Sequence, residues 1–97
     1  MYEIEYTRNA LEDLASFKKR EQQIIASAID EQLTWQPTLE TRNRKPLQPN
    51  EISQWELRIG QYRVFYDADT VVRIVAIKAI GKKRHNQLYI RGRKFKL

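Results

Sequence analysis

The stretch WELRIGQYRVFY, residues 55–66, decides the fold class of this chain. Apolar and polar side chains alternate from Trp55 to Ile59 and again from Tyr62 to Tyr66, which is typical of strands with one buried face. Gly60 and Gln61 separate the two runs and predict a turn. The stretch therefore predicts two consecutive strands that pair with each other.

The sequence downstream continues the sheet. A polar turn over residues 67–70 is followed by residues 71–80, which are apolar at nearly every position and predict a central strand covered on both sides. Gly81 ends that strand, residues 88–90 predict a short edge element, and residues 94–97 are expected to be loosely held.

The sequence upstream predicts a strand and two helices. Residues 2–6 alternate apolar and acidic side chains, and Thr7 can cap a helix over residues 8–19. A second helix starts near Glu21 and ends before Pro37. The two helices are expected to form an antiparallel hairpin, and residues 37–53, with three prolines, a basic loop.

These elements predict one α+β domain over residues 1–97, in the order β-α-α-β-β-β. We expect the two-helix hairpin to pack on one face of a mainly antiparallel sheet. The opposite face of the sheet is then the expected working face.

Charge is distributed unevenly over a chain whose net charge is +6. Residues 1–40 hold eight acids and four bases, whereas residues 81–97 hold seven bases and no acid. This asymmetry favours a polyanion partner, most simply RNA, although solubility is an alternative explanation. With no cysteine, one histidine and no long apolar run, we expect no metal, no cofactor, no membrane span and a cytoplasmic location.

Alternation along residues 55–66 predicts a basic face. Arg58 lies on one side of its strand with Glu56, and Arg63 shares a side with Phe65. Guanidinium groups beside an exposed ring would suit phosphate and base recognition in RNA. The alternative is that Phe65 is a core residue and that Arg63 pairs with Glu56 across the strands.

The segment GKKRHNQLY, residues 81–89, follows directly on the predicted central strand. Attack of an RNA 2′-hydroxyl on the adjacent phosphate needs a base, charge stabilisation at phosphorus and an acid for the leaving oxygen. The lysines and arginine supply charge without a metal, and His85 or Tyr89 is a candidate for proton transfer. The alternative is a basic turn that only binds phosphate.

Residues 55–66, the apolar strand and the 81–89 segment together resemble the RelE/ParE superfamily of bacterial type II toxins. The resemblance covers nearly the whole chain and implies a microbial-RNase-like fold and a cognate antitoxin. RelE-like members cut mRNA in the ribosomal A site without a metal, and ParE-like members poison DNA gyrase.

The resemblance also implies roles for individual residues. Arg63 matches the arginine that holds the scissile phosphate, Lys83 a second phosphate-stabilising cation, and Tyr89 a tyrosine that stacks on the substrate nucleotide. Gln54 and Glu56 replace two lysines, so Glu56 becomes the candidate base, with His85 or Tyr89 as the acid. The expected RNA-binding residues are Arg42, Arg44, Lys45, Arg58, Phe65, Lys82 and Arg84.

The sequence therefore predicts a ribosome-dependent mRNA endonuclease, monomeric as a toxin and part of a higher-order toxin–antitoxin complex. Gyrase inhibition of the ParE kind is one alternative. A catalytically weakened member that serves mainly as the antitoxin's partner is another, because both lysines are replaced.

Overall fold

The computed structural model describes all 97 residues, as two helices and a seven-stranded sheet. In chain order the elements are β1 (Glu3–Tyr6), α1 (Arg8–Ala15), α2 (Lys19–Leu33), β2 (Arg44–Pro46), β3 (Trp55–Ile59), β4 (Tyr62–Asp69), β5 (Ile74–Arg84), β6 (Gln87–Ile90) and β7 (Arg93–Phe95). None of the helices combines the length and the apolar character needed to cross a bilayer. The structure is thus the α+β fold that the sequence predicts.

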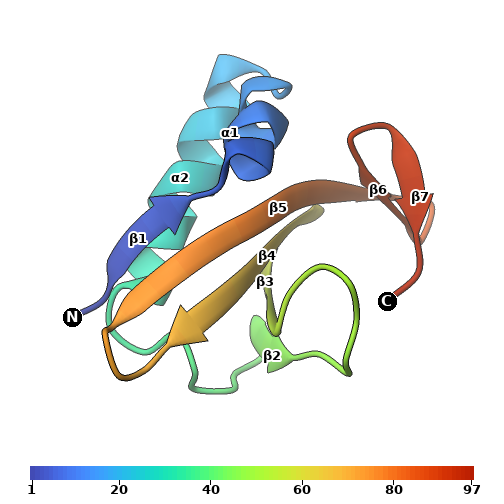
Figure 1. Cartoon of the computed structure of the whole chain (residues 1–97). Helices are drawn as coiled ribbons and strands as arrows, with labels where there is room; N and C mark the ends of the chain where they lie inside the picture. Colours follow the sequence, from blue (N-terminus) through green and yellow to red (C-terminus); the bar gives the residue numbers. More distant parts are fainter.

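Strand β5 organises the sheet (Figure 1). The strands follow the order β2-β3-β4-β5-β6-β7, and β1 pairs with β5 in parallel beside its first residues. The neighbouring pairs from β2 to β7 are antiparallel. The alternating stretch 55–66 forms β3 and the start of β4, with Gly60 in the left-handed conformation in the turn between them.

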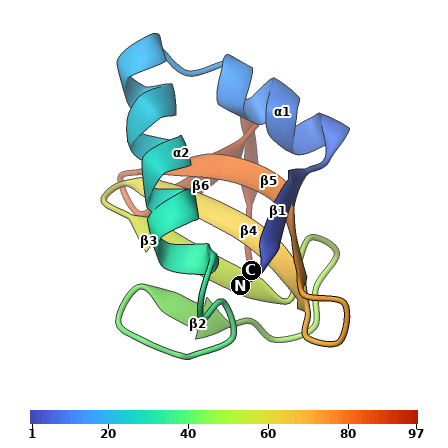
Figure 2. The same ribbon diagram turned by 90° about the vertical axis from the view of Figure 1, so that its left-hand side faces the viewer.

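Both helices cover the same face of the sheet. Ala10 of α1 and Ile25, Ile29 and Leu33 of α2 are fully buried against apolar side chains of β3, β4 and β5. In Figure 2, α1 runs across the upper end of the sheet and α2 runs down its face. A short connection over residues 16–18 joins the two helices, and both pack on this one face of the sheet, as the sequence predicts.

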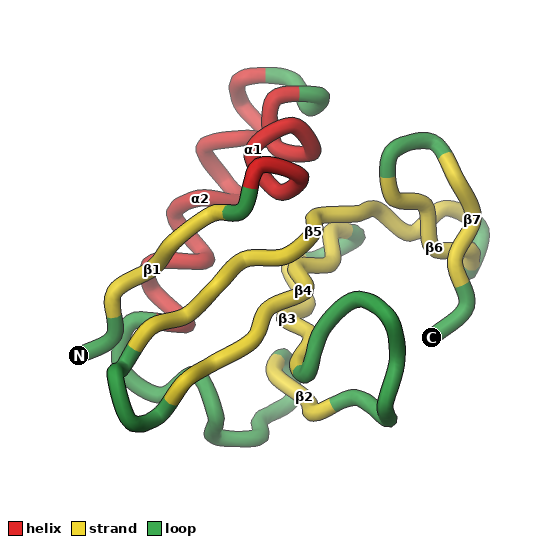
Figure 3. Tube along the Cα trace, in the orientation of Figure 1, coloured by secondary structure: helices red, strands yellow, loops and turns green.

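The opposite face of the sheet has a smaller core under a loop. Phe65, Ala79, Leu88 and Ile90 are buried there, with Leu47 and Ile52 packed against them. Leu47 and Ile52 belong to the loop between β2 and β3, which is drawn in green in Figure 3. Part of the expected working face is thus covered by this loop.

Side chains form hydrogen bonds with the backbone groups of β5 that lie between the segments paired with β1 and β6. Strand β1 pairs with residues 74–77 and β6 with residues 82–84. In the gap, the Thr7 hydroxyl donates to the carbonyl oxygens of Ile77 and Lys78, and the Ile80 N–H donates to Asp13 Oδ2 at 3.0 Å. Thr7 also caps α1, as predicted, by accepting from the Ala10 N–H.

Several element bounds differ from those predicted. The central strand starts at Ile74, because Val71 and Val72 lie in an exposed turn closed by Asp69, and it runs past Gly81 to Arg84. Pairing with neighbouring strands turns residues 44–46 of the expected loop into β2 and residues 93–95 of the tail into β7. Helix α1 ends at Ala15 because Ser16 folds back on the Asp13 carbonyl.

Candidate functional site

A cluster of cations lies on the face of the sheet opposite the helices. It forms a concavity of about 140 Å³, which we call the basic pocket, lined by Arg42, Asn43, Lys45, Glu56, Arg58, Arg63 and Lys83. Strand register assembles it, since Lys45 faces Glu56, Arg58 faces Arg63, and Arg63 faces Gly81, two residues before Lys83. Four adjacent strands therefore contribute to one site.

Arg63 is the most buried member of the basic pocket, at 7% exposure. Its Nη1 donates to the carbonyl oxygens of Gly60 at 2.7 Å and Tyr62 at 2.9 Å, which fixes the guanidinium on the β3–β4 turn. Burial lowers the pKa of Arg63, Glu56 opposes that shift and Arg58 adds to it. The remaining nitrogens of the guanidinium make no hydrogen bond within the chain, so they remain available to an anion.

Two arginines face each other directly across β3 and β4. Arg58 and Arg63 form a registered pair, and Glu56, the carboxylate that lines the pocket, forms its ion pair with Lys45 at 3.8 Å. Like charges that oppose each other in an antiparallel pair destabilise the sheet. The basic pocket therefore carries unbalanced positive charge that a bound anion would neutralise. The cross-strand pair of Glu56 with Arg63, which was the alternative interpretation, does not form, because Glu56 faces Phe65.

The 81–89 segment splits its side chains between the two faces of the sheet. Lys83 lines the basic pocket, whereas Lys82, Arg84 and Tyr89 line a groove on the helix side. Successive residues of a strand point to opposite faces, so the three basic residues in a row cannot serve one pocket. Arg63 and Lys83 therefore share the basic pocket, whereas Tyr89 lies on the other face of the sheet.

His85 lies at the tip of the β5–β6 hairpin. His85 and Asn86 form the turn, with φ values of 50° and 64°, and the imidazole lines neither the basic pocket nor the helix-side groove. This histidine is exposed. The structure therefore brings together Glu56, Arg63 and Lys83 of the predicted catalytic residues and separates His85 and Tyr89 from them.

Two of the predicted RNA-binding residues, Phe65 and Arg44, are buried and have structural roles. Phe65 has 0% exposure and packs with Ala79 and Leu88, so it offers no ring to a base. Arg44 faces Leu57 on the helix side and donates through Nη1 to the Gln32 carbonyl oxygen at the end of α2. The expectation of nucleic-acid contact is therefore wrong for both residues, since neither side chain reaches the surface of the basic pocket.

The helix-side groove, called here the hairpin groove, lies between the α1–α2 connection and the C-terminal hairpins. Its volume is about 670 Å³, and its lining includes Phe17, Lys18, Glu21, Lys82, Arg84, Tyr89 and Arg91. Glu21, one of the lining residues, accepts a hydrogen bond at Oε2 from the Tyr62 hydroxyl at 2.5 Å, and Lys82 Nζ lies 3.6 Å from the same oxygen. Hydrogen bonding to Glu21 raises the pKa of Tyr62 to about 12, and the Tyr62 hydroxyl chiefly lowers the pKa of Glu21.

Sequence patterns missed several members of these sites. Glu21 and Lys18 belong to a helix start, and Arg91 to a turn, so local periodicity assigns them to solvent. Asp13 was missed as well, since it is buried at 2%, whereas the apolar Leu11 two positions earlier is 53% exposed. The position of Asp13 three residues after Ala10, on the same face of the helix, was the available signal.

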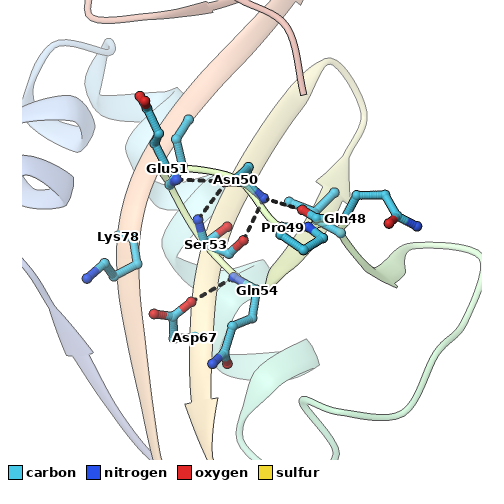
Figure 4. A pocket seen from close by; sticks show the side chains of 10 residues that line it. Gln48, Pro49, Asn50, Glu51, Ser53, Gln54, Asp67 and Lys78 are labelled. Carbon is cyan, nitrogen blue, oxygen red and sulfur yellow. Dashed lines mark hydrogen bonds between the residues drawn. The ribbon is translucent and has the colours of Figure 1, made fainter.

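A further pocket of about 480 Å³ lies under the 47–54 loop (Figure 4). Asn50 organises that loop by donating to the carbonyl oxygens of Gln48 and Ser53 and accepting from the N–H groups of Ile52 and Ser53. Gln54 N–H donates to Asp67, which ties the loop to β4. None of the predicted site residues lines this pocket.

Comparison with known proteins agrees with this architecture. Residues 4–87 match the family model described as ParE toxin of type II toxin-antitoxin system, parDE. No curated protein matches the sequence.

Two solved structures share the fold. The toxin–antitoxin complex RelBE2 of Mycobacterium tuberculosis contains a chain 24% identical, with a TM-score of 0.73, and the match covers 84% of this chain and 98% of that one. A chain of the archaeal RelE–RelB complex of Pyrococcus horikoshii OT3 is 16% identical, with a TM-score of 0.60 and coverage of 87% and 96%. At these identities the likeness concerns the fold. The family match over most of the chain identifies it as a member of the ParE toxin family of type II toxin–antitoxin systems, within the RelE/ParE superfamily.

Proposed function

We propose that this toxin is a metal-independent, ribosome-dependent endoribonuclease that cuts mRNA in the ribosomal A site and so inhibits translation. The observation that carries the proposal is the unneutralised Arg58–Arg63 pair beside Lys83 in the basic pocket. Fixed cations placed where negative charge develops are the main means of stabilising a phosphoryl transition state.

In this mechanism the basic pocket holds the scissile phosphate. The free nitrogens of Arg63 and the ammonium of Lys83 bind its non-bridging oxygens. Glu56 takes the proton of the 2′-hydroxyl while the 2′ oxygen forms its bond to phosphorus. As the bond from phosphorus to the 5′ oxygen breaks, Lys83 donates a proton to that leaving oxygen. The products are a 2′,3′-cyclic phosphate and a 5′-hydroxyl. Arg42 and Lys45 bind neighbouring phosphates.

A cognate antitoxin completes the proposal. Both solved relatives are complexes of a toxin with its antitoxin, and the basic pocket offers an acidic antitoxin segment a complementary surface. The toxin would be monomeric, cytoplasmic, and part of a higher-order toxin–antitoxin complex. An antitoxin segment that covers Arg63 would neutralise the toxin.

Expression of the toxin in bacterial cells tests the activity. We expect arrested translation and new mRNA ends, and in a purified translation system we expect cleavage that persists in EDTA. Arg63→Ala removes bonds that hold the β3–β4 turn, so Lys83→Ala is the cleaner inactive variant. Arg8→Ala, at an exposed position on α1, is the matched charge-loss control. Intact mRNA in cells that stop growing would overturn the proposal.

Gyrase inhibition is the second candidate, and the family match favours it because the matching model describes ParE toxins. This function needs no acid–base pair, so Lys83→Ala would leave toxicity intact. A supercoiling assay with purified gyrase, alongside mapped mRNA ends, separates the two. The third candidate is a catalytically weakened member, which would act in neither assay and still bind its antitoxin. This role is favoured by Gln54, which replaces one of the two lysines and accepts a hydrogen bond from the Ala68 N–H.

A further inference from the structure

The β5–β6 hairpin presents cations to both faces of the sheet. Lys82 and Arg84 line the hairpin groove, and Lys83 between them lines the basic pocket. The turn at the tip has only His85 and Asn86 between the paired residues Arg84 and Gln87. Lys82, Lys83 and Arg84 are consecutive residues of β5 beside this turn, so the two sites lie back to back on opposite faces of the sheet next to the hairpin tip.

The hairpin groove keeps excess positive charge after its internal ion pairs are counted. Four cations line it, namely Lys18, Lys82, Arg84 and Arg91, against one carboxylate, Glu21. Glu21 is engaged by Tyr62 and Lys82, and Arg91 by the buried Asp13. Lys18 and Arg84 have no carboxylate partner within the chain. These two side chains are free to bind an external anion.

The groove also contains aromatic rings beside the cations. Tyr89 is half-buried in β6 directly opposite Lys82, and its hydroxyl makes no hydrogen bond within the chain. Phe17 meets Tyr62 edge to face, at 5.5 Å between ring centroids. Rings interleaved with cations are typical of single-stranded nucleic-acid sites, where bases stack and phosphates pair. An acidic peptide would use the cations and gain less from the rings.

We infer that the hairpin groove is a second site for single-stranded RNA, and that one strand crosses the β5–β6 hairpin to occupy both sites. The cleaved phosphate lies in the basic pocket, and nucleotides next to it stack on Tyr89 and bind Lys18 and Arg84. The inference rests on the proposed function and extends it, since it assigns the flanking nucleotides to the helix side of the sheet.

Binding of a short, fluorescently labelled oligoribonucleotide with 2′-O-methyl groups tests the inference without cleavage. Affinity is measured by anisotropy over a range of salt concentrations. The variant Lys18→Ser/Arg84→Ser is expected to lower the salt slope by about 1.4, because each lost phosphate contact on a single strand contributes about 0.7. Tyr89→Leu is expected to weaken binding by about tenfold, and Tyr89→Phe to restore it, because stacking needs only the ring.

The controls separate this site from the basic pocket. Arg8→Ser lies on exposed α1 and should bind as the wild type does. Circular dichroism establishes that each variant is folded. Wild-type slope and affinity in Lys18→Ser/Arg84→Ser, together with weakened binding in Lys83→Ser, would overturn the groove inference and leave the endoribonuclease proposal standing. If Lys18→Ser/Arg84→Ser instead lost binding to a polyglutamate peptide while its RNA binding stayed unchanged, the groove would be assigned to a protein partner. That result would also overturn the groove inference.

Discussion

Asp13 of α1 holds Arg91 in the turn after β6, with Arg91 Nη1 2.9 Å from both carboxylate oxygens. The same carboxylate accepts the Ile80 N–H of β5. Asp13 is buried, so its charge is stabilised by these two donors alone. One side chain thereby ties α1, the central strand and the C-terminal hairpins together and sets one wall of the hairpin groove.

Removal of this carboxylate is expected to destabilise the fold. Asp13→Ala leaves the Ile80 N–H buried without an acceptor and Arg91 without its partner, and should cost about 3 kcal/mol of unfolding free energy. Asp13→Asn keeps one acceptor and should cost about half as much. Urea unfolding followed by tryptophan fluorescence measures both. Glu12→Gln, at the exposed neighbouring position, should change stability by less than about 0.5 kcal/mol, and an equal loss there would contradict the assigned role.

A methyl group at Gly81 is expected to force the β5–β6 pair apart. A Cβ at this position would lie 2.6 Å from the Tyr89 carbonyl oxygen and 2.8 Å from Ile90 Cγ1. Gly81→Ala should therefore cost about 1–3 kcal/mol through overpacking. Gly92→Asn is the control, because its surroundings are open and asparagine tolerates the left-handed conformation. Thermal unfolding that is unchanged in Gly81→Ala would show that β6 does not pack as described.

Relief of the Arg58–Arg63 repulsion is expected to stabilise the protein in the absence of an anion. Arg58→Gln removes one charge from the facing pair and should raise the unfolding free energy by about 0.5 kcal/mol, which is a few degrees in Tm. The same variant should gain less stability from added polyphosphate than the wild type does, because the pocket holds one cation fewer. Differential scanning fluorimetry measures both effects, and Arg8→Gln is the control. A lower Tm for Arg58→Gln without anion would show that the pair does not repel.

Loss of the Lys83 ammonium is expected to abolish most RNA cleavage. If Lys83 stabilises the transition state, Lys83→Ala should reduce the cleavage rate by about 10²–10³-fold with little change in stability, since the side chain is only half-buried at the end of β5. Primer extension on mRNA from a reconstituted translation reaction gives the rate. Equal cleavage by Lys83→Ala and Arg8→Ala would exclude Lys83 from the chemistry.

The Tyr62–Glu21 hydrogen bond predicts a stability loss at alkaline pH. The pKa of Tyr62 rises from 10.0 to about 12 on folding, so between these values the unfolded chain releases a proton that the folded chain retains. The bond therefore contributes fully below pH 10 and is lost as pH approaches 12. Tyr62→Phe should lower stability at neutral pH, and its unfolding free energy, measured by urea unfolding at each pH, should fall less steeply between pH 10 and 12 than that of the wild type. If the unfolding free energies of the wild type and of Tyr62→Phe fell in parallel between pH 10 and 12, the role assigned to the Tyr62–Glu21 hydrogen bond would be contradicted.

Much of the fold was readable from local patterns. Alternation over residues 55–66 predicted two paired strands and placed Arg63 on one side of β4, and the Thr7 cap predicted where α1 begins. Alternation also implies that Lys82 and Lys83 point apart. These features depend on residues close together in the chain, so a single sequence reveals them.

The composition of each site depended on long-range packing. Which face carries Tyr89 followed from the two-residue turn and the register of β6 against β5, and the loop over the second core determined that Phe65 is buried. Asp13 and Arg91, 78 positions apart, meet only because β1 and β6 leave part of the β5 edge open. A side chain's pattern is a local property, whereas its burial and partners depend on strand register and on the segments that cover each face, and neither is encoded in the spacing of neighbouring residues.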